Sequence, residues 1–263
     1  MFLRRFFKIG DKVRWLLLEL VVVFIGVYLA FLFNSYNERV KNEKEREKVL
    51  ISLKKEIDKF RLSAPLNAEG QSNVLNKWRE AYKEGELVRF DNWRFLEPQY
   101  NFQVIEYAIN QSGTDIIEFE LFRAVSELYR EIKQLEHSER MMTTRSGQYK
   151  IIPEGLSKNS ENYMLLAAEN KFNLQRMIAA AFDRVNNLNQ VAQWADDISI
   201  LINERITIDQ QNEVAFDILP DFFKGVDGDT FFLKELYLEK FEHLPVDELD
   251  EKLHELAKDY NYE

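Results

Sequence analysis

The chain of 263 residues carries a formal net charge of −10 and contains no cysteine. The length predicts one or two domains, and the lack of cysteine excludes disulfides and thiol chemistry. An acidic chain is a poor partner for nucleic acid, because phosphate contacts require a basic surface.

The charge is divided unevenly along the chain. Residues 1–14 hold five basic side chains and one acidic side chain, a net charge of +4, so the remaining residues carry −14. A short basic segment of this kind suits the anionic headgroups of a lipid bilayer. We therefore interpret residues 1–14 as a basic juxtamembrane stub.

An apolar stretch follows at residues 15–34, interrupted by one carboxylate, Glu19. About 19 of these residues span about 28 Å as an α-helix, close to the hydrocarbon thickness of a bilayer at about 30 Å. The run is longer than the apolar region of a cleaved signal peptide, and it is apolar on all sides, unlike a core helix of a soluble protein. The sequence predicts a transmembrane helix that serves as an uncleaved signal anchor.

The residues of this helix that are least suited to lipid gather on one side. At 100° per residue, Glu19, Gly26 and Ala30 fall within about 40° of one another, and Tyr28 lies opposite. Small residues four apart allow a second helix to approach closely, and a carboxylate in a membrane usually faces protein or water. We therefore predict a transmembrane interaction face composed of Glu19, Val23, Gly26, Ala30, Asn34 and Asn37.

Two other interpretations of Glu19 remain open. Its carboxylate can snorkel to the nearby interface, which makes the stripe incidental, or it can line a water-filled path in an oligomer.

A basic segment before an uncleaved anchor favours an N-in orientation, although residues 1–14 and 35–48 hold equal numbers of lysine and arginine. We expect a single-pass protein of a bacterial inner membrane with its C-terminal domain outside the cytoplasm.

The helix is predicted to continue as a charged stalk over residues 35–62, because no glycine or proline occurs between Ala30 and Pro65. The charged side chains at 38–48 are expected to be solvated. Four apolar residues then recur at 3-4-3 spacing and give the stalk one apolar face: Leu50, Leu53, Ile57 and Phe60. Ser63 is predicted to cap a second helix, with Pro65 in its first turn.

Residues 63–263 are predicted to form an acidic helical domain. Periodicity and turn residues place its helices at residues 63–83, 101–111, 117–145, 161–204, 231–241 and 246–257. Residues 205–209 are interpreted as a short strand or an extended segment. The predicted fold class is all-α, with one N-terminal transmembrane helix that continues into a long stalk helix, followed by an antiparallel helical bundle.

Two segments of the chain carry a recognisable pattern. The first is Leu18-Glu19-x6-Gly26-x3-Ala30-x3-Asn34-x2-Asn37-Glu38-Arg39, and the second is Tyr107-x4-Ser112-Gly113-x3-Ile117-x3-Leu121-x6-Leu128-Tyr129. Together they resemble a family of uncharacterised single-span bacterial membrane proteins, in which a tryptophan more often stands before the second asparagine, where this chain has Tyr36. The resemblance implies a membrane location and a helical domain, and it implies no known reaction.

The candidate catalytic and metal motifs are incomplete. Arg130-x6-His137 has the loose spacing of a ribonuclease motif of small helical domains, but this spacing is common by chance on charged helices. Glu251-x-x-His254 is half of a di-metal bundle site, and the sequence has no second Glu-x-x-His. We expect no catalytic residue, no cofactor and no metal.

The sequence therefore predicts a membrane-anchored helical scaffold or interaction protein, not an enzyme, that self-associates through its transmembrane helix. The alternative is a subunit of an oligomeric membrane pore or ion pathway lined by Glu19. The expected partners are the lipid bilayer, further copies of the chain and an unidentified protein. Nucleic acid is not an expected partner.

Overall fold

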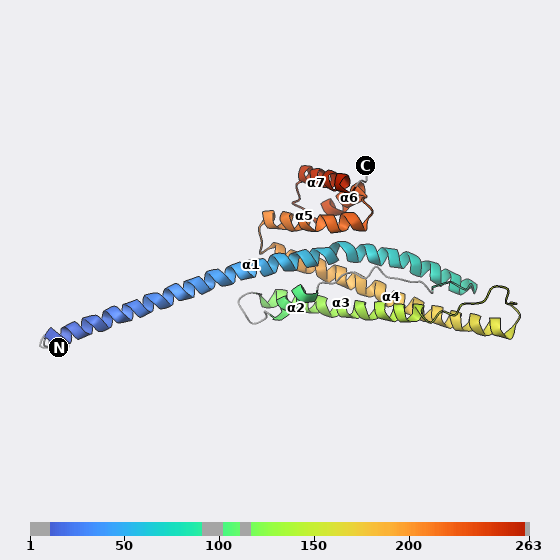
Figure 1. Ribbon diagram of the computed structural model, residues 1–263, viewed down its shortest axis with the longest axis horizontal. Helices are drawn as coiled ribbons and strands as arrows, with labels where there is room; N and C mark the ends of the chain where they lie inside the picture. The colour runs from blue at the N-terminus through green and yellow to red at the C-terminus, as the bar shows by residue number, and fades with distance from the viewer. Residues whose placement is uncertain (1–10, 91–101, 111–116, 261–263) are drawn as a thin grey trace. The chain divides into compact units, whose positions relative to one another are not determined.

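The computed structural model describes residues 11–90, 102–110 and 117–260, and all of their regular elements are helices (Figure 1). The predicted all-α class is confirmed. The helices are α1 (Asp11–Glu84), α2 (Phe102–Asn110), α3 (Phe119–Ser146), α4 (Glu161–Asn203), α5 (Ile208–Gly225), α6 (Thr230–Lys240) and α7 (Val246–Asp259). The chain divides into two units, residues 1–48 and residues 49–263.

The first unit holds the N-terminal part of α1. Its large apolar side chains between Val13 and Phe33 are all exposed, and no part of its most apolar window is buried within the protein. Among the described residues, α1 is the one helix that is long and apolar enough to cross a membrane. Most of the basic stub, residues 1–14, lies outside the described residues.

Residues 34–48 continue α1 with charged side chains. Arg39 and Glu43 form an ion pair with 3.9 Å between Nε and Oε1, and both side chains are about 70% exposed. Exposed pairs of this kind contribute only about 0–1 kcal/mol, because water and salt screen them. This ion pair therefore adds little to the stability of the helix.

The second unit begins at Val49, because core side chains start there. Leu50, Leu53, Ile57 and Phe60, the predicted apolar face of the stalk, are all buried. Residues 49–62 thus belong to the compact helical unit together with residues 63–263. Their partners are the apolar stripes of α3 and α4.

Three helices form the main bundle of the second unit: the C-terminal part of α1, α3 and α4 (Figure 1). Contacts join Lys54 to Ser199 and Arg184 to Gln71, so α4 runs antiparallel to α1. Arg184 also contacts Glu139, while Asn187 contacts Ser138, so α4 runs antiparallel to α3 as well. Because α1 and α3 are consequently parallel, the end of α1 and the start of α3 lie at opposite ends of the bundle, and α2 packs against α3.

The periodic stripes of α3 and α4 account for the bundle core. In α3 the residues at 4-3-4-3 spacing are fully buried: Leu121, Val125, Leu128, Ile132 and Leu135. In α4 the buried positions recur every seven residues, at Leu174, Ala181, Leu188 and Ala195. Each fully buried Leu, Ile or Val contributes about 1.5–3 kcal/mol of transfer free energy.

The predicted helix boundary at Ser63 is wrong, because α1 runs without interruption from Asp11 to Glu84. The Ser63 hydroxyl does not cap a new helix; it donates a hydrogen bond to the Lys59 carbonyl, with 2.7 Å between the oxygens. Pro65 lies inside the helix and removes the backbone donor that the Arg61 carbonyl would receive. Burial of Leu62, Ala64 and Ala68 on both sides of the proline holds this part helical.

The interpretation of residues 205–209 as a short strand or an extended segment is right only in part: they form no strand, Thr207 is extended, and residues 208 and 209 already belong to α5. Thr207 begins α5 through a capping box, in which its side chain accepts a hydrogen bond from the Gln210 backbone and the Gln210 side chain accepts one from the Thr207 backbone. The pair Thr207-x-x-Gln210 is a recognised sequence signal for a helix start. Sequence reasoning missed this signal and assigned no element to residues 210–226.

Helices α5, α6 and α7 form a small helical cap on α1. Their apolar residues enclose a separate core that takes Leu62 from α1, with Phe223, Leu233, Tyr237 and Leu249 fully buried within it. Asp227 and Gly228 both have positive φ angles and form the turn between α5 and α6.

Candidate functional site

All six residues of the predicted transmembrane interaction face lie on the continuous helix α1, and all are exposed: Glu19, Val23, Gly26, Ala30, Asn34 and Asn37. The helix brings them onto one stripe at 100° per residue. No residue of the second unit is needed to build this face. The stripe is therefore available to a partner that the single chain does not supply.

Gly26 occupies open space on this stripe. A Cβ atom added there meets no atom within 4 Å, so the chain's own packing does not require glycine. Further along the stripe, the Asn34 side-chain amide donates a hydrogen bond to Glu38, with 3.1 Å between Nδ2 and Oε1. The Gly26–Ala30 pair thus leaves a shallow place on the helix surface where another helix could approach closely.

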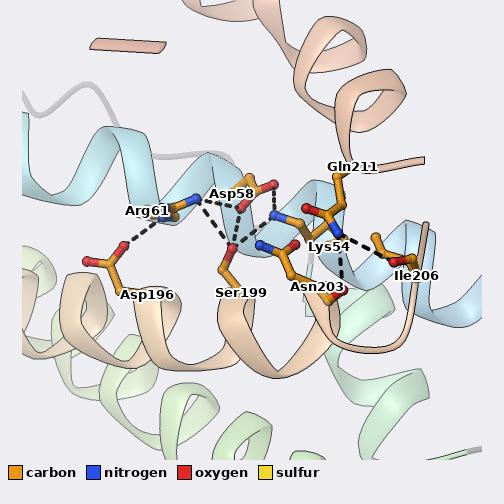
Figure 2. Close-up of polar contacts among 8 residues, drawn as sticks. All are labelled: Lys54, Asp58, Arg61, Asp196, Ser199, Asn203, Ile206 and Gln211. Atoms are coloured by element: carbon orange, nitrogen blue, oxygen red, sulfur yellow. Dashed lines mark hydrogen bonds and ion pairs between the residues drawn. The ribbon is translucent and has the colours of Figure 1, made fainter. Parts of the chain in front are cut away.

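A second candidate site lies inside the helical unit, where α1 meets α4 (Figure 2). We name Lys54, Asp58 and Ser199 the buried polar cluster; their side chains are at most 1% exposed. The Lys54 ammonium donates to Asp58 at 2.5 Å and to the Ser199 hydroxyl at 2.9 Å. The Ser199 hydroxyl in turn donates to the other Asp58 oxygen at 3.0 Å.

The rim of this cluster is formed by Arg61 and Asp196, which join the same two helices. The distance from Arg61 Nε to Asp196 Oδ1 is 2.7 Å, and the Arg61 guanidinium also lies 3.4 Å from the Ser199 hydroxyl. On the side of α6, the Phe241 ring centroid lies 5.7 Å from the Lys54 ammonium and 5.6 Å from the Arg61 guanidinium. The aromatic face therefore adds a weak attraction for both cations.

Burial changes the acid–base properties of this region. Desolvation lowers the pKa of Lys54 below its ordinary value, although the neighbouring Asp58 carboxylate opposes the shift. Burial also raises the pKa of Tyr237 well above its ordinary value, and the charge of Asp58 adds to this shift. The Tyr237 hydroxyl has no hydrogen-bond partner among the described residues, so its burial carries an uncompensated cost.

A lysine beside a serine hydroxyl can activate a nucleophile, but this cluster is not arranged for that chemistry. The Lys54 ammonium donates a hydrogen bond to Asp58, and the Ser199 hydroxyl donates its hydrogen to the same carboxylate. All three side chains are sealed from solvent, so a substrate has no access to the hydroxyl. The geometry instead fixes the register of α1 against α4.

A second buried ion pair ties all three bundle helices together. Arg184 of α4 donates to Glu139 of α3 with 3.0 Å between Nε and Oε1, and both side chains are at most 7% exposed. Arg184 also donates to the Gln71 side-chain oxygen of α1 at 3.2 Å. Each helix of the main bundle therefore supplies one polar group to this contact.

The sequence motifs considered for catalysis acquire no catalytic geometry. Arg130 pairs with Glu127 at 2.8 Å and with Glu131 at 2.9 Å, while His137 lies on the same exposed side of α3. Across residues 11–90, 102–110 and 117–260, no set of three or more His, Asp or Glu side chains is placed to hold a metal ion. This finding includes Glu251 and His254.

Sequence reasoning missed the buried polar cluster. Lys54 and Arg61 project from nearly the same side of the helix as Leu50 and Ile57, about 20–60° away from them at 100° per residue. Charges on an apolar face, spaced so that Lys54 meets Asp58 one turn later, are the signal that could have revealed the cluster. The signal for Ser199 is weaker, because a serine on a helix indicates no particular partner.

No family model, no curated protein and no solved structure matches the chain. The resemblance to single-span bacterial membrane proteins therefore stays a prediction. Part of its second segment, Ser112-Gly113, lies outside the described residues.

Proposed function

We propose that this protein is a membrane-anchored helical scaffold or interaction protein that self-associates through the apolar part of α1. One observation carries the proposal: the most apolar window of the helix is wholly exposed, and its small and polar residues share one stripe. A surface this apolar is costly in water, so it requires lipid around it, and the stripe within it suits a second helix.

Glu19 supports a protein-facing stripe. An exposed carboxylate within an apolar span is expensive in a bilayer, and the cost falls when the side chain meets a polar partner. When two copies meet at this stripe, Glu19 and Asn34 supply polar groups that can bond across the interface, while Gly26 and Ala30 admit close backbone approach. The role is structural, and we assign the protein no reaction and no cofactor.

The proposed location is a bacterial inner membrane, with a single span in the N-in orientation and the helical unit outside the cytoplasm. The basic segment 1–14 supports this orientation, because cytoplasmic flanks are enriched in lysine and arginine. A reporter active in the periplasm and a reporter active in the cytoplasm, each fused after Glu263, test the orientation. Activity of the cytoplasmic fusion alone would reverse it.

Self-association can be tested with disulfide crosslinking, because the chain has no native cysteine. Single variants Val23→Cys and Ala30→Cys should form dimers on mild oxidation in native membranes, and Tyr28→Cys, on the opposite side, should not. As a second readout, Gly26→Leu and Ala30→Leu should weaken association because a bulky side chain separates the backbones, while Tyr28→Leu should leave it unchanged. Equal behaviour of all positions would remove the face from the proposal.

The second candidate function is an oligomeric pore or ion pathway lined by Glu19, and the position of that carboxylate within the apolar window favours it. Glu19→Gln keeps hydrogen bonding and removes charge, so a scaffold should assemble normally, whereas Glu19→Leu should weaken assembly. Reconstituted protein should not conduct ions. Conductance that loses its cation preference in Glu19→Gln, with the oligomer intact, would establish the pore instead.

A further inference from the structure

The helical unit carries a groove between α3 and α4 that its own fold does not fill. The groove encloses about 730 Å³, and its walls come from residues 130–145 of α3 and 176–187 of α4. Most of the lining side chains, including Arg130, Lys133 and Arg176, are exposed. We name this surface the α3–α4 groove.

The lining of the groove gathers basic side chains on an acidic protein. Four cations line it, Arg130, Lys133, Arg145 and Arg176, against the single carboxylate Asp183. Three glutamates of α3 lie next to the lining and pair with Arg130 and Lys133, so they offset the charge of those two cations. The attraction for an anionic group is therefore concentrated at Arg145 and Arg176.

Two of these cations are not balanced by the protein itself. Arg130 pairs with Glu127 and Glu131, and Lys133 pairs with Glu136. In contrast, the Arg145 guanidinium donates a hydrogen bond to the neutral Gln148 side chain, with 2.9 Å between Nη1 and Oε1. The Arg176 guanidinium lies 4.4 Å from the centroid of the Phe172 ring. Neither Arg145 nor Arg176 forms an ion pair with a carboxylate in the described part of the chain, so both can receive one from outside.

Beside the groove, the exposed surface of α4 carries an apolar seam, and Ala179 is the seam residue that also lines the groove. Leu165, Phe172 and Ala179 recur every seven residues, and Phe182 follows at the next three-residue step. Leu165, Phe172 and Phe182 are 57%, 54% and 44% exposed. A repeat of seven residues is the one that helices use to pack against each other, and the bundle core already uses a different seam of α4. The Phe182 end of the seam lies towards α1, because the Arg79 guanidinium is 5.2 Å from the centroid of its ring.

The two arginines and the apolar seam together favour one kind of occupant. An amphipathic helix whose apolar stripe is flanked by Asp and Glu would cover the seam and place carboxylates at Arg145 and Arg176. A second copy of the chain is a poor fit, because a two-fold contact would bring Arg145 and Arg176 against a surface that carries the same two cations. A long polyanion is also a poor fit, because it would extend beyond the groove over an acidic protein.

We propose that the α3–α4 groove binds an acidic amphipathic helix of a partner protein. The proposal goes beyond self-association through the span and does not depend on it, because the two surfaces lie in different units. The groove would then recruit the partner to the membrane to which α1 anchors the unit.

The test uses the full chain in lipid nanodiscs and a fluorescent helical peptide of about 21 residues, three heptads with Leu and Ala on its seam and Glu beside it. Three comparison peptides are used: the same seam flanked by Lys, the Glu peptide broken by a central proline, and disordered polyglutamate. The Glu peptide should bind with an affinity that falls as salt rises, and each comparison peptide should bind at least about tenfold more weakly.

Charge reversal locates the binding. In Arg145→Glu/Arg176→Glu, affinity for the Glu peptide should fall at least about tenfold, and affinity for the Lys peptide should rise. The control Lys77→Glu/Lys158→Glu changes net charge equally at exposed positions outside the groove lining and should bind like the unaltered chain. Circular dichroism verifies that both variants remain helical.

Several results would overturn the proposal. Equal binding of the Glu and Lys peptides would mean that the groove does not select acidic side chains. Binding of polyglutamate as tight as that of the Glu peptide would mean that no apolar helical seam is recognised. Unchanged binding after charge reversal would place the site elsewhere. Loss of the oligomer in Arg145→Glu/Arg176→Glu would assign the groove to contact between copies. Failure of the crosslinking experiment at Val23 and Ala30 would leave this proposal intact, so the two can fail separately.

Discussion

Helix α1 has two parts, residues 13–33 and residues 49–62, that differ in the exposure of their apolar side chains. In the first part, every large apolar side chain is exposed, including Leu20, Ile25 and Phe31. In the second part, Leu53, Ile57 and Leu62 are fully buried, and polar residues occupy most of the remaining surface. The difference arises from sequence pattern, since the backbone is helical in both.

The two patterns of apolar residues require different surroundings. An apolar stripe on one face needs a partner on that face, and α3 and α4 provide it within the chain. An apolar surface on all sides cannot be covered by one neighbour, and it suits the apolar interior of a bilayer. Similar substitutions in the two parts of α1 should therefore have different effects.

The largest difference is expected at the two carboxylates that lie among apolar residues, Asp58 and Glu19. Asp58→Ala leaves Lys54 buried without its counter-charge and should lower the free energy of unfolding of the helical unit by about 3–5 kcal/mol. The double variant Lys54→Met/Asp58→Leu removes both charges and should recover to within about 2 kcal/mol of the unaltered protein. Denaturant unfolding in a mild detergent, followed by circular dichroism, measures both values.

Glu19→Ala is the matched control for that experiment and should not change unfolding of the helical unit. A loss of stability at Glu19 similar to that at Asp58 would show that the two parts of α1 are not distinct. A double variant as unstable as Asp58→Ala would show that the cluster does more than compensate its own charges.

The second difference is expected for leucine truncation. Leu53→Ala opens a cavity in the bundle core and should cost about 2–5 kcal/mol of unfolding free energy. Leu20→Ala truncates a side chain that is 65% exposed and should leave the same transition unchanged. Parallel unfolding curves in the same detergent compare them, and equal shifts would contradict the assignment of the two environments.

The smallest effect, and one of opposite sign, is expected at Tyr237, where α6 meets the buried part of α1. Tyr237→Phe removes a buried hydroxyl without a partner and should raise the unfolding free energy by about 1–2 kcal/mol at pH 8. The raised pKa of Tyr237 adds a pH dependence, because the unfolded chain loses this proton above its ordinary pKa of 10.0 while the folded protein keeps it.

The unaltered protein should therefore lose stability relative to Tyr237→Phe as the pH rises above 10. Unfolding curves of both proteins at pH 8, 10 and 11 measure this difference. A Tyr237→Phe variant that is less stable at pH 8, or whose advantage shrinks at pH 11, would mean that the hydroxyl is satisfied in the folded state.

Sequence reasoning performed well where one periodic pattern dominates. The stripes around Leu128 and Leu188 predicted α3 and α4 nearly to their ends, because burial on one face of a helix repeats in the sequence. It failed at Ser63 and Pro65, where the local signals of a helix start were strong. Burial of the flanking side chains outweighed the loss of one backbone hydrogen bond there.

The candidate sites were less predictable than the fold. The transmembrane face follows from residue spacing on one helix, so it could be proposed without tertiary information. The buried polar cluster joins Lys54 to Ser199, and the α3–α4 groove joins Arg145 to Arg176; both pairs require the packing of two helices. Positions of charge across different helices are set by register, which a single sequence does not report.

We propose that residues 13–33 of α1 lie in a lipid bilayer, and cysteine accessibility tests this placement most directly. In the cysteine-free chain, Leu20→Cys, Ile25→Cys and Asn42→Cys would each be treated in native membranes with a membrane-impermeant maleimide applied to both sides. We predict that Asn42→Cys reacts and that Leu20→Cys and Ile25→Cys react only after the membrane is dissolved in denaturing detergent. Labelling of Leu20→Cys and Ile25→Cys in intact membranes as fast as that of Asn42→Cys would contradict the membrane assignment.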